Sequence, residues 1–483
     1  MTTGIRSSVG FSFFWVVVCA VSVGCFGVVR GAPNVLVIMA DDCTYNDLPV
    51  YGGKNARTPN LDRLAEESLV FDRAYVSMSM CQPCRSELFT GQFPLRNGCA
   101  WNHSGSRVGV RSMPQLMGGL GYRVGIAGKV HVEPEAVYPF ERVAGFDGNC
   151  VRNPTSKHEL AGVKSFMGRD AGEPFCLVVA LVEPHVPWVM GDASAYPPEG
   201  LKLPLNLADT PRTRRDFAAY CAEITYMDGQ VGEVLALLGE LGLEEETVVI
   251  FTSEQGSQFP GNKWNCWDTG LHTGLMVRWP GRVMAGERTD AMVAYADVLP
   301  TLVELAGGDV GVPGLALDGR SFRRVLLEGE GTHREYVYGL HNNLPEGPAY
   351  PIRTVSDGRW RYVRNLMPGE LYIQKYVMGV QGDGKLNNPY WGTWVFSSEA
   401  NEASYRLVKR VMQRPAEELY DTLIDPYEMN NLVDSVYVRG VRERLAGELD
   451  RWMSGQGDPG AAMDMREALG AARRGEHLYY PGR

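Results

Sequence analysis

A short thiol motif is the stretch of this sequence whose residue types and spacing are most specific for chemistry. Cys81 is followed by Pro83, Cys84 and Arg85, and the stretch ends in Leu-x-Thr-Gly at Gly91. A Cys-x-x-Cys pair at a helix start, with proline before the second cysteine, is typical of thioredoxin-type redox motifs, in which the helix dipole acidifies the first thiol. A structural disulfide or a buried pair of thiols is the simpler alternative. Neither alternative accounts for the arginine or for the Thr-Gly ending.

Two adjacent carboxylates follow the first predicted strand of the chain. Residues 34–40 are apolar and rich in β-branched side chains, which predicts a buried parallel strand, and Asp41 and Asp42 come directly after it. Open α/β sheets place their sites at the carboxyl ends of strands. One aspartate there would be explained as a strand-end cap, but burying two is costly unless a cation neutralises them. A hard cation such as Ca²⁺, which takes oxygen ligands, meets that need.

Three more predicted strands run into polar residues at their carboxyl ends. They cover residues 121–128, 175–182 and 247–253, and each is short and apolar. The polar residues that follow them are Lys129 and His131, then His185, then Glu254 and Gln255. A lone lysine or histidine is usually structural, but the first two lie two residues apart and therefore on one face of an extended segment. That pair favours a site.

In this order the motifs resemble the signatures of the type I, formylglycine-dependent sulfatases. The resemblance rests on the Asp-Asp strand end, Thr-Pro-Asn-Leu-Asp from Thr58, Cys-x-Pro-x-Arg and Gly-Lys-x-His. In that family the first cysteine is converted after translation to formylglycine, an aldehyde, which implies that Cys81 becomes the nucleophile. Pro83 and Arg85 would form the signal for a formylglycine-generating or equivalent maturation enzyme, and the arginine would later support the modified side chain. The family usually has Ser, Ala or Thr in place of Cys84.

The resemblance also implies a metal site with one Ca²⁺ per chain. Its ligands would be Asp41, Asp42, the modified Cys81, Glu254 and Gln255. Most sulfatases have Asp-Asn where this chain has Glu-Gln. The replacement keeps one carboxylate and one amide, each longer by a methylene, so the metal has to sit differently or the backbone has to retreat.

The remaining candidates would handle charge and protons. Lys129 and Lys263 would offset the charge of the sulfate, and His185 or Lys263 would protonate the leaving atom. His131 would take the proton from the second hydroxyl of the hydrated aldehyde. His272 is a further, weaker candidate for the pocket.

Among sulfatases, the likeness is greatest to the heparan N-sulfatases, or sulfamidases. It rests on residues 128–140 and on residues 350–355, and the latter stretch, with His341 before it, is expected to contact substrate. The expected activity is hydrolysis of an O-sulfate or N-sulfo group from a sulfated glycan. A catalytically impaired glycan-binding homologue and a phosphatase or phosphodiesterase of the same superfamily are the alternatives.

The composition sets outer limits on these interpretations. The chain has 483 residues, of which 45% are hydrophobic and 22% charged, so it is several times longer than a thioredoxin domain of about 100 residues. Its net charge is −10, and without a lysine or arginine run it is not expected to bind nucleic acid. An acidic protein that acts on an anionic substrate must concentrate its positive charge in one pocket.

The expected organisation has three parts. Residues 1–32 are predicted to be an export signal, for a secreted or periplasmic protein, or a lysosomal one in a eukaryote; an uncleaved membrane anchor is the alternative. Residues 33–336 are expected to form an α/β catalytic domain with the alkaline-phosphatase-like sulfatase fold, a large, mixed but mostly parallel sheet flanked by helices. Residues 337–483 are expected to form a smaller domain with an antiparallel sheet that completes the substrate pocket, ending in a loose tail after Arg466. The eight cysteines after residue 32 do not resemble a disulfide scaffold.

Overall fold

The computed structural model describes residues 1, 2, 4, 31–170, 172–312, 314–379 and 389–480. Residues Ala32–Arg483 make one compact unit. The predicted export signal falls almost wholly outside the described residues. Among those that are described, no helix is both long enough and apolar enough to cross a membrane.

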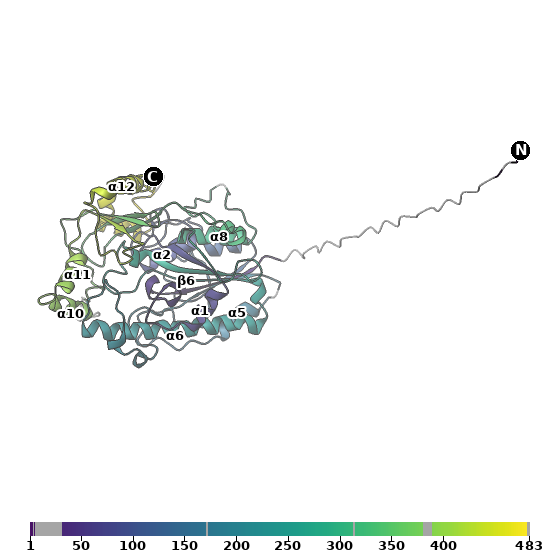
Figure 1. The fold of residues 1–483 in the computed structure, drawn as a ribbon, viewed down its shortest axis with the longest axis horizontal. Coiled ribbons are helices and arrows are strands. Elements are labelled where there is room, and N and C mark those ends of the chain that lie inside the picture. The colour runs from purple at the N-terminus through teal and green to yellow at the C-terminus, as the bar shows by residue number, and fades with distance from the viewer. Residues whose placement is uncertain (3, 5–30, 171, 313, 380–388, 481–483) are drawn as a thin grey trace. The chain divides into compact units, whose positions relative to one another are not determined.

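A mixed, mostly parallel sheet forms the centre of this unit (Figure 1). Within the described chain it has nine strands in the order β4-β3-β5-β1-β6-β7-β2-β8, with β9 also paired to β2. The strands are β1 (Asn34–Ala40), β2 (Leu69–Tyr75), β3 (Arg123–Gly128), β4 (Glu141–Val143), β5 (Phe175–Ala180), β6 (Thr247–Ser253), β7 (His272–Arg278), β8 (Glu287–Thr289) and β9 (Val293–Ala294). Only β7 runs antiparallel to its neighbours β6 and β2. The predicted fold class is therefore confirmed, and β1, buried between two parallel strands, explains the uninterrupted apolar run of residues 34–40.

Helices cover both faces of the sheet (Figure 1). On one side lie α1 (Pro59–Glu66), α5 (Ala161–Gly168) and α6 (Pro211–Leu241), and on the other lie α2 (Cys81–Thr90) and α8 (Val298–Leu305), with α4 (Met113–Gly118) packed on α8. Three shorter helices are α3 (Pro94–Asn97), α7 (Asp268–Leu271) and α9 (Arg323–Glu328). The helix α6 begins seven residues before the apolar periodicity that predicted it, because Thr210 caps it by accepting from the Thr213 amide and Pro211 suits its first turn.

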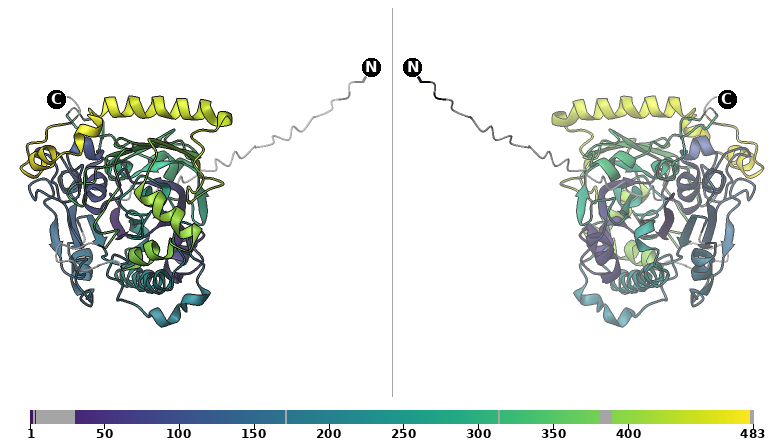
Figure 2. Two further views of the ribbon diagram at one scale, coloured as in Figure 1. Left: turned by 90° about the vertical axis from the view of Figure 1, so that its left-hand side faces the viewer. Right: turned by 90° about the vertical axis from the view of Figure 1, so that its right-hand side faces the viewer.

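A second, antiparallel sheet lies in the C-terminal third of the chain. Over the residues described there, its order is β10 (Val337–His341), β11 (Ile352–Ser356), β12 (Trp360–Asn365) and β13 (Glu417–Asp421). The long helix α12 (Arg439–Gly455) packs on β11 and β12 and is prominent in Figure 2. The smaller antiparallel sheet is thus as predicted, while the division into domains at residue 336 stays a prediction.

Three C-terminal helices were not predicted. They are α10 (Tyr390–Ser397), α11 (Glu402–Met412) and α13 (Arg466–Arg473). The expectation of a loose tail after Arg466 is wrong for α13, because its apolar face is buried through Ala468, Leu469 and Ala472. Just before this helix, Asp464 accepts hydrogen bonds from the Trp101 indole and from the backbone amides of residues 343, 344 and 350.

A buried ion network joins the two sheets. The Arg361 guanidinium of β12 lies 2.8 Å from Asp268 Oδ1 of α7 and 3.3 Å from Glu428 Oε1. All three side chains are at most 7% exposed. Because buried charges without a partner are costly, this arginine is essential to the join between the sheets.

We predict that Arg361→Ala lowers the free energy of unfolding by about 3–5 kcal/mol, since it removes the buried guanidinium that Asp268 and Glu428 share. Denaturant unfolding of the variant and the parent protein measures this loss. The control is Arg406→Ala, because Arg406 forms an exposed i,i+4 pair with Glu402 and its loss should cost at most roughly 0.5 kcal/mol. Equal stability of the two variants would contradict the importance assigned to the buried network.

Candidate active site

The polar residues predicted from the strand ends converge at one edge of the central sheet. β1 lies between β5 and β6, and β5 also pairs with β3, so the carboxyl ends of all four strands are neighbours. The backbone amides of Asp41 and Glu254 donate to the carbonyls of Glu183 and Ala40, which ties the three strand ends together. Asp42 has a positive φ of 57°, a conformation that non-glycine residues rarely adopt outside functional sites.

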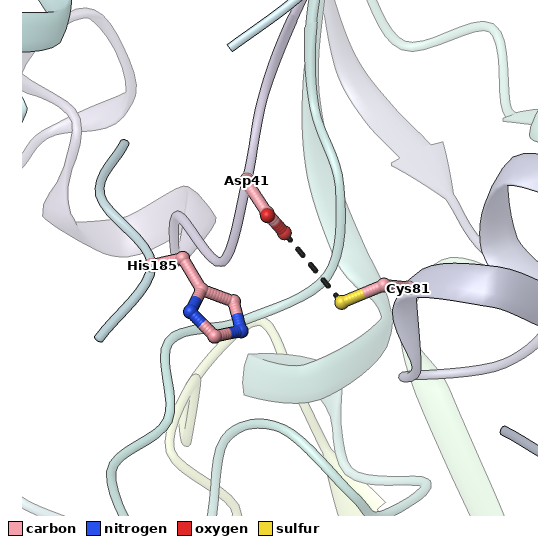
Figure 3. A group of neighbouring side chains, drawn as sticks. All are labelled: Asp41, Cys81 and His185. Atoms are coloured by element: carbon pink, nitrogen blue, oxygen red, sulfur yellow. Dashed lines mark hydrogen bonds between the residues drawn. The ribbon is translucent and has the colours of Figure 1, made fainter. Parts of the chain in front are cut away.

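The thiol of Cys81 lies at the centre of this edge, at the first residue of α2. It donates to Asp41 Oδ1 at 3.5 Å, an interaction drawn in Figure 3, and its Sγ lies 3.7 Å from Asp42 Oδ1. The Lys263 ammonium donates to the same sulfur at 3.1 Å, and the Gln255 amide donates at 3.3 Å. The two early aspartates and the later Glu-Gln pair, far apart in sequence, therefore meet at one thiol.

Each buried carboxylate of the cluster faces its own cation. Lys129 pairs with Asp41, Lys263 Nζ lies 2.7 Å from Asp42 Oδ1, and Arg85 pairs with Glu254. This last pair lacks hydrogen-bond geometry at Arg85 Nε, whereas Arg85 Nη1 donates to the backbone carbonyl of Lys129. Without these partners, burial of three carboxyl groups so close together would be costly.

The cluster has the composition of a site for a hard cation. Ligand atoms of Asp41, Asp42, Cys81 and Glu254 all lie within 4.8 Å of one another. The carbonyl oxygen of the Gln255 side chain is buried beside them and has no hydrogen-bond partner. A second group that satisfies the same distance criterion consists of Asp41, Cys81 and His185 (Figure 3). Because carboxylate and amide oxygens prevail in the first group, its residues fit Ca²⁺ better than a soft transition metal.

Burial and ion pairing set the ionisation of the cluster. Burial tends to raise the pKa of Asp41, but Lys129, a hydrogen bond with Glu254 and the nearby His185 and Arg85 together outweigh it, so this pKa lies well below its ordinary value. For Glu254 burial prevails over Arg85, and its pKa lies well above the ordinary value. Burial, followed by the charge of Asp41, raises the pKa of the Cys81 thiol. An unmodified Cys81 is therefore a neutral thiol and a poor nucleophile.

The two histidines of the site differ in protonation. Burial and the nearby Lys129 ammonium lower the pKa of His131 well below its ordinary value, so its ring is neutral. Burial also opposes the charge on His185, but Asp42, whose Oδ2 lies 3.5 Å from Nε2, together with Cys150 and Asp41 outweighs it and raises the pKa. Because His185 Nδ1 donates to the Val186 carbonyl, an added proton resides on Nε2. The site thus holds one histidine suited to accept a proton and one suited to donate it.

A cavity of about 720 Å³ opens above the thiol. Five of the six predicted catalytic residues line it: Cys81, Lys129, His131, His185 and Lys263. The sixth, Arg85, is completely buried behind them. The structure thus brings the predicted catalytic and metal-binding residues together at one edge of the sheet, while their roles stay a prediction.

The comparisons with known proteins agree with this geometry. The sulfatase family model matches residues 33–308 of the chain. An ulvan-active sulfatase of Formosa agariphila is 31% identical over 436 residues, which cover 88% of this chain and 81% of that protein. The N-sulphoglucosamine sulphohydrolase of Homo sapiens is 30% identical over 481 residues, 90% of this chain and 92% of that protein.

The chain belongs to the sulfatase family. It is accordingly a sulfuric ester hydrolase by class. Solved structures share the fold: a putative sulfatase of Bacteroides fragilis gives a TM-score of 0.67 at 19% identity, covering 90% of this chain and 98% of that one. A structure described as BT4656 in complex with its substrate D-glucosamine-2-N,6-O-disulfate gives 0.65 at 19% identity, covering 88% and 98%.

Several residues that line the cavity of this sulfatase were not predicted from the sequence. They come from loops and from the starts of α6 and α10, and they include Asn102, His103, Cys150, Trp188, Arg212 and Tyr390. Cys150 is the chemically notable one. Burial would raise the pKa of its thiol, but Lys129 and His185 outweigh burial and lower it to about 6. Its position was not predictable because no motif surrounds it.

Two expectations about substrate contacts are wrong for this cavity. His341 is fully buried, with Nε2 3.4 Å from Asn343, and residues 350–355 belong to the interior of the second sheet, where Arg353 pairs with Asp458. His272 is bound by Asp268 and by the Asp72 carbonyl. None of these residues lines the cavity above Cys81. Their polar groups hold strands together, which sequence alone does not distinguish from binding.

The thiols of the Cys-x-x-Cys motif are not a redox pair in this structure. Cys81 and Cys84 are both free, as are the other cysteines in the described part of the chain. Burial raises the pKa of both thiols, whereas a redox motif of this type needs an acidified first thiol. All ten residues of α2 are buried, so the motif is shielded from a protein partner.

We predict that iodoacetamide at pH 7, in the presence of EDTA, labels Cys150 before Cys81 in protein whose Cys81 is unmodified. The reason is that alkylation requires a thiolate, which a pKa of about 6 provides at Cys150 and a raised pKa denies to Cys81. Peptide mass spectrometry over a time course measures the two rates. Cys150→Ser serves as the control and should leave the cavity unlabelled on the same timescale; faster labelling of Cys81 would contradict the charge distribution described above.

Proposed function

We propose that this sulfatase removes sulfate groups, as O-sulfate or N-sulfo, from a sulfated carbohydrate by means of a formylglycine formed from Cys81 and one bound Ca²⁺. The observation that carries the proposal is the position of the Cys81 sulfur at the floor of the cavity, where it lies 3.5 Å from Asp41 Oδ1, 3.7 Å from Asp42 Oδ1 and 3.1 Å from the Lys263 ammonium. A nucleophile at that point meets both a cation site and the positive charge that a sulfate requires.

The carbohydrate substrate is supported by the relatives. The names of two of them specify ulvan and N-sulfoglucosamine, and a neighbour in structure was solved with a disulfated glucosamine. All three are sulfated sugars, which differ in the atom that carries the sulfate. We therefore propose for this chain only what the three have in common, which is a substrate with a sulfuryl group on a sugar.

Two groups absent from the polypeptide sequence complete the chemistry. Hydrated formylglycine would supply a hydroxyl nucleophile with a second hydroxyl through which the sulfate is released. Ca²⁺ would polarise the sulfate, and the residues that would hold it are Asp41, Asp42, residue 81, Glu254 and Gln255. A plain cysteine or serine could not release its sulfate adduct in this way. The chain itself contributes Lys129 and Lys263, whose ammonium groups offset the charge of the sulfuryl group as it is transferred.

Proton transfer falls to the two histidines. His185, with its raised pKa and its proton on Nε2, protonates the leaving oxygen or nitrogen of the sugar. His131, neutral because of burial and Lys129, takes the proton from the second hydroxyl when sulfate departs. Arg85, held by Glu254 and by the Lys129 carbonyl, keeps residue 81 and the lysine strand end in register.

Export and maturation belong to the same proposal. Residues 1–32 act as the export signal of a secreted or periplasmic enzyme, and a formylglycine-generating or equivalent enzyme converts Cys81. Residues 33–336 form the catalytic domain, and residues 337–483 form the domain that closes the cavity. Tyr376 and Tyr390, which line the cavity, support this contribution of the C-terminal part.

We expect the protein matured with a formylglycine-generating enzyme to hydrolyse sulfate esters or N-sulfo groups of glucosamine-type sugars, and Cys81→Ala to reduce the rate by at least about a thousandfold, since covalent catalysis is lost. Released sulfate is measured by ion chromatography, with phosphate monoesters and diesters assayed in parallel. Mass spectrometry of the tryptic peptide around residue 81 should show the aldehyde in place of the thiol. Active protein with an unmodified Cys81 bonded to Cys84, or faster phosphate than sulfate release, would refute the proposal.

We also expect each chain to bind one Ca²⁺ and to unfold at a higher temperature with Ca²⁺ than with EDTA, because the ion binds the folded state only. Equilibrium dialysis and thermal unfolding measure both effects independently of activity. Asp42→Asn should lose them, whereas Asp47→Asn should retain them, because Asp47 is a buried carboxylate outside the cluster. Ion binding that survives in Asp42→Asn would place the metal elsewhere.

A further inference from the structure

The outer part of the cavity has an aromatic wall that the proposed chemistry does not use. Trp188 and Tyr390 both line the cavity, and their rings lie 6.3 Å apart at an interplanar angle of 23°. Trp188 also stacks on the buried ring of Phe259 at 4.6 Å, and its indole nitrogen donates to the Pro184 carbonyl. The wall is therefore fixed in orientation before any ligand binds.

A charged pair from α6 lines the same outer region. Arg212 and Asp216 are one turn apart, and the Arg212 Nε lies 2.8 and 3.0 Å from the two oxygens of the Asp216 carboxylate. Both terminal nitrogens of Arg212 are without a hydrogen bond in the described structure, and the side chain is 38% exposed. Gln258 adds an amide to this part of the lining. The outer region thus offers free donors, acceptors and an apolar plane, but almost no net charge.

This combination matches the two surfaces of a pyranose ring. The face of such a ring presents C–H bonds and packs on an aromatic plane, while its edge carries hydroxyl groups that donate and accept hydrogen bonds. Arg212 would donate hydrogen bonds to a hydroxyl group of the sugar, and Asp216 would accept one from a neighbouring hydroxyl. A few such polar groups orient ligands in otherwise apolar pockets. An anion suits the region less well, because Asp216 already neutralises Arg212.

The size of the cavity leaves room for this use. Its volume of about 720 Å³ lies in the upper part of the range, about 300–1,000 Å³, that accommodates drug-sized ligands. The sulfuryl group and its own sugar occupy the floor between Lys129, Lys263 and His185. The remaining volume is bounded by Trp188, Tyr390 and Arg212.

We infer that Trp188, Arg212 and Asp216 form a subsite for a second, uncharged sugar ring, joined to the ring that carries the reacting sulfate. The inference rests on the proposed sulfatase function and adds to it that the substrate is an oligosaccharide. Binding energy from this second ring is remote from the reacting sulfur and helps to position the sulfate over residue 81.

The test measures binding in the Cys81→Ala background, which holds substrate without hydrolysing it. The probes are a sulfated glucosamine and a disaccharide in which that sugar is linked to a neutral hexose, and isothermal titration calorimetry gives their affinities. We expect the disaccharide to bind about tenfold more tightly than the monosaccharide, the equivalent of two or three net hydrogen bonds or stacking contacts. In Arg212→Gln this advantage should disappear, while the affinity for the monosaccharide stays unchanged.

The matched control is Arg215→Gln, an exposed arginine on the same helix that does not line the cavity. It makes the same charge change and should keep the advantage of the disaccharide. Trp188→Ala should lose it and Trp188→Phe should restore most of it, with thermal unfolding as the check that both variants are folded. Because Arg212 is partly exposed, its variant keeps the test decisive even if Trp188→Ala does not fold.

A third probe, in which the second sugar carries a carboxylate or a sulfate, separates a sugar subsite from an anion subsite. A disaccharide advantage that appears only with these charged probes, that is equal in Arg212→Gln, or that is absent from the parent would overturn the inference. The proposed function fails in a different way: tight binding of the disaccharide without turnover by the matured enzyme would reject the hydrolytic function while leaving the subsite intact.

Discussion

The compensation of three buried carboxylates by three buried cations is the constraint on which the site depends. Asp41, Asp42 and Glu254 follow two adjacent parallel strands, where burial of three neighbouring carboxyl groups would destabilise the fold if no cations lay beside them. Lys129 comes from a third strand, Lys263 from the loop after β6, and Arg85 from α2. The sheet order therefore does more than support the site, because it brings charges of opposite sign from five segments to one point.

This arrangement explains how the chain accommodates Glu254 and Gln255 where most sulfatases have Asp-Asn. The longer side chain of Glu254 reaches Arg85 and also lies within hydrogen-bonding reach of Asp41. Gln255 likewise reaches both the sulfur of Cys81 and Asp42 Oδ1, at 3.3 and 2.6 Å. The extra methylene groups thus bring these two side chains to the centre of the cluster without displacing the strand end, whose Glu254 amide still donates to the Ala40 carbonyl.

The sequence was most informative where chemistry follows a buried strand. Polar site residues could be predicted at the ends of four strands, β1, β3, β5 and β6. Each of these strands is an apolar run rich in β-branched residues, and each is followed by charged residues that cannot be buried without a partner. The wall residues Cys150, Trp188 and Arg212 could not be found in this way, since they lie on loops or on a helix face where tertiary packing alone decides what faces the cavity. The same holds for His341 and Arg353, which are polar residues of strands, and for α13, whose burial depends on contacts with distant segments.

The complete burial of α2 limits when residue 81 can be altered. Ten consecutive buried residues leave no surface that a modifying enzyme could bind, and the Asp464 carboxylate accepts from the Trp101 indole and so helps to hold the loop that follows α3. If Cys81 is converted as proposed, the burial of α2 requires that the conversion take place on the emerging or unfolded polypeptide. Folding that outruns this step would then yield a protein that is stable, correctly shaped and permanently inert.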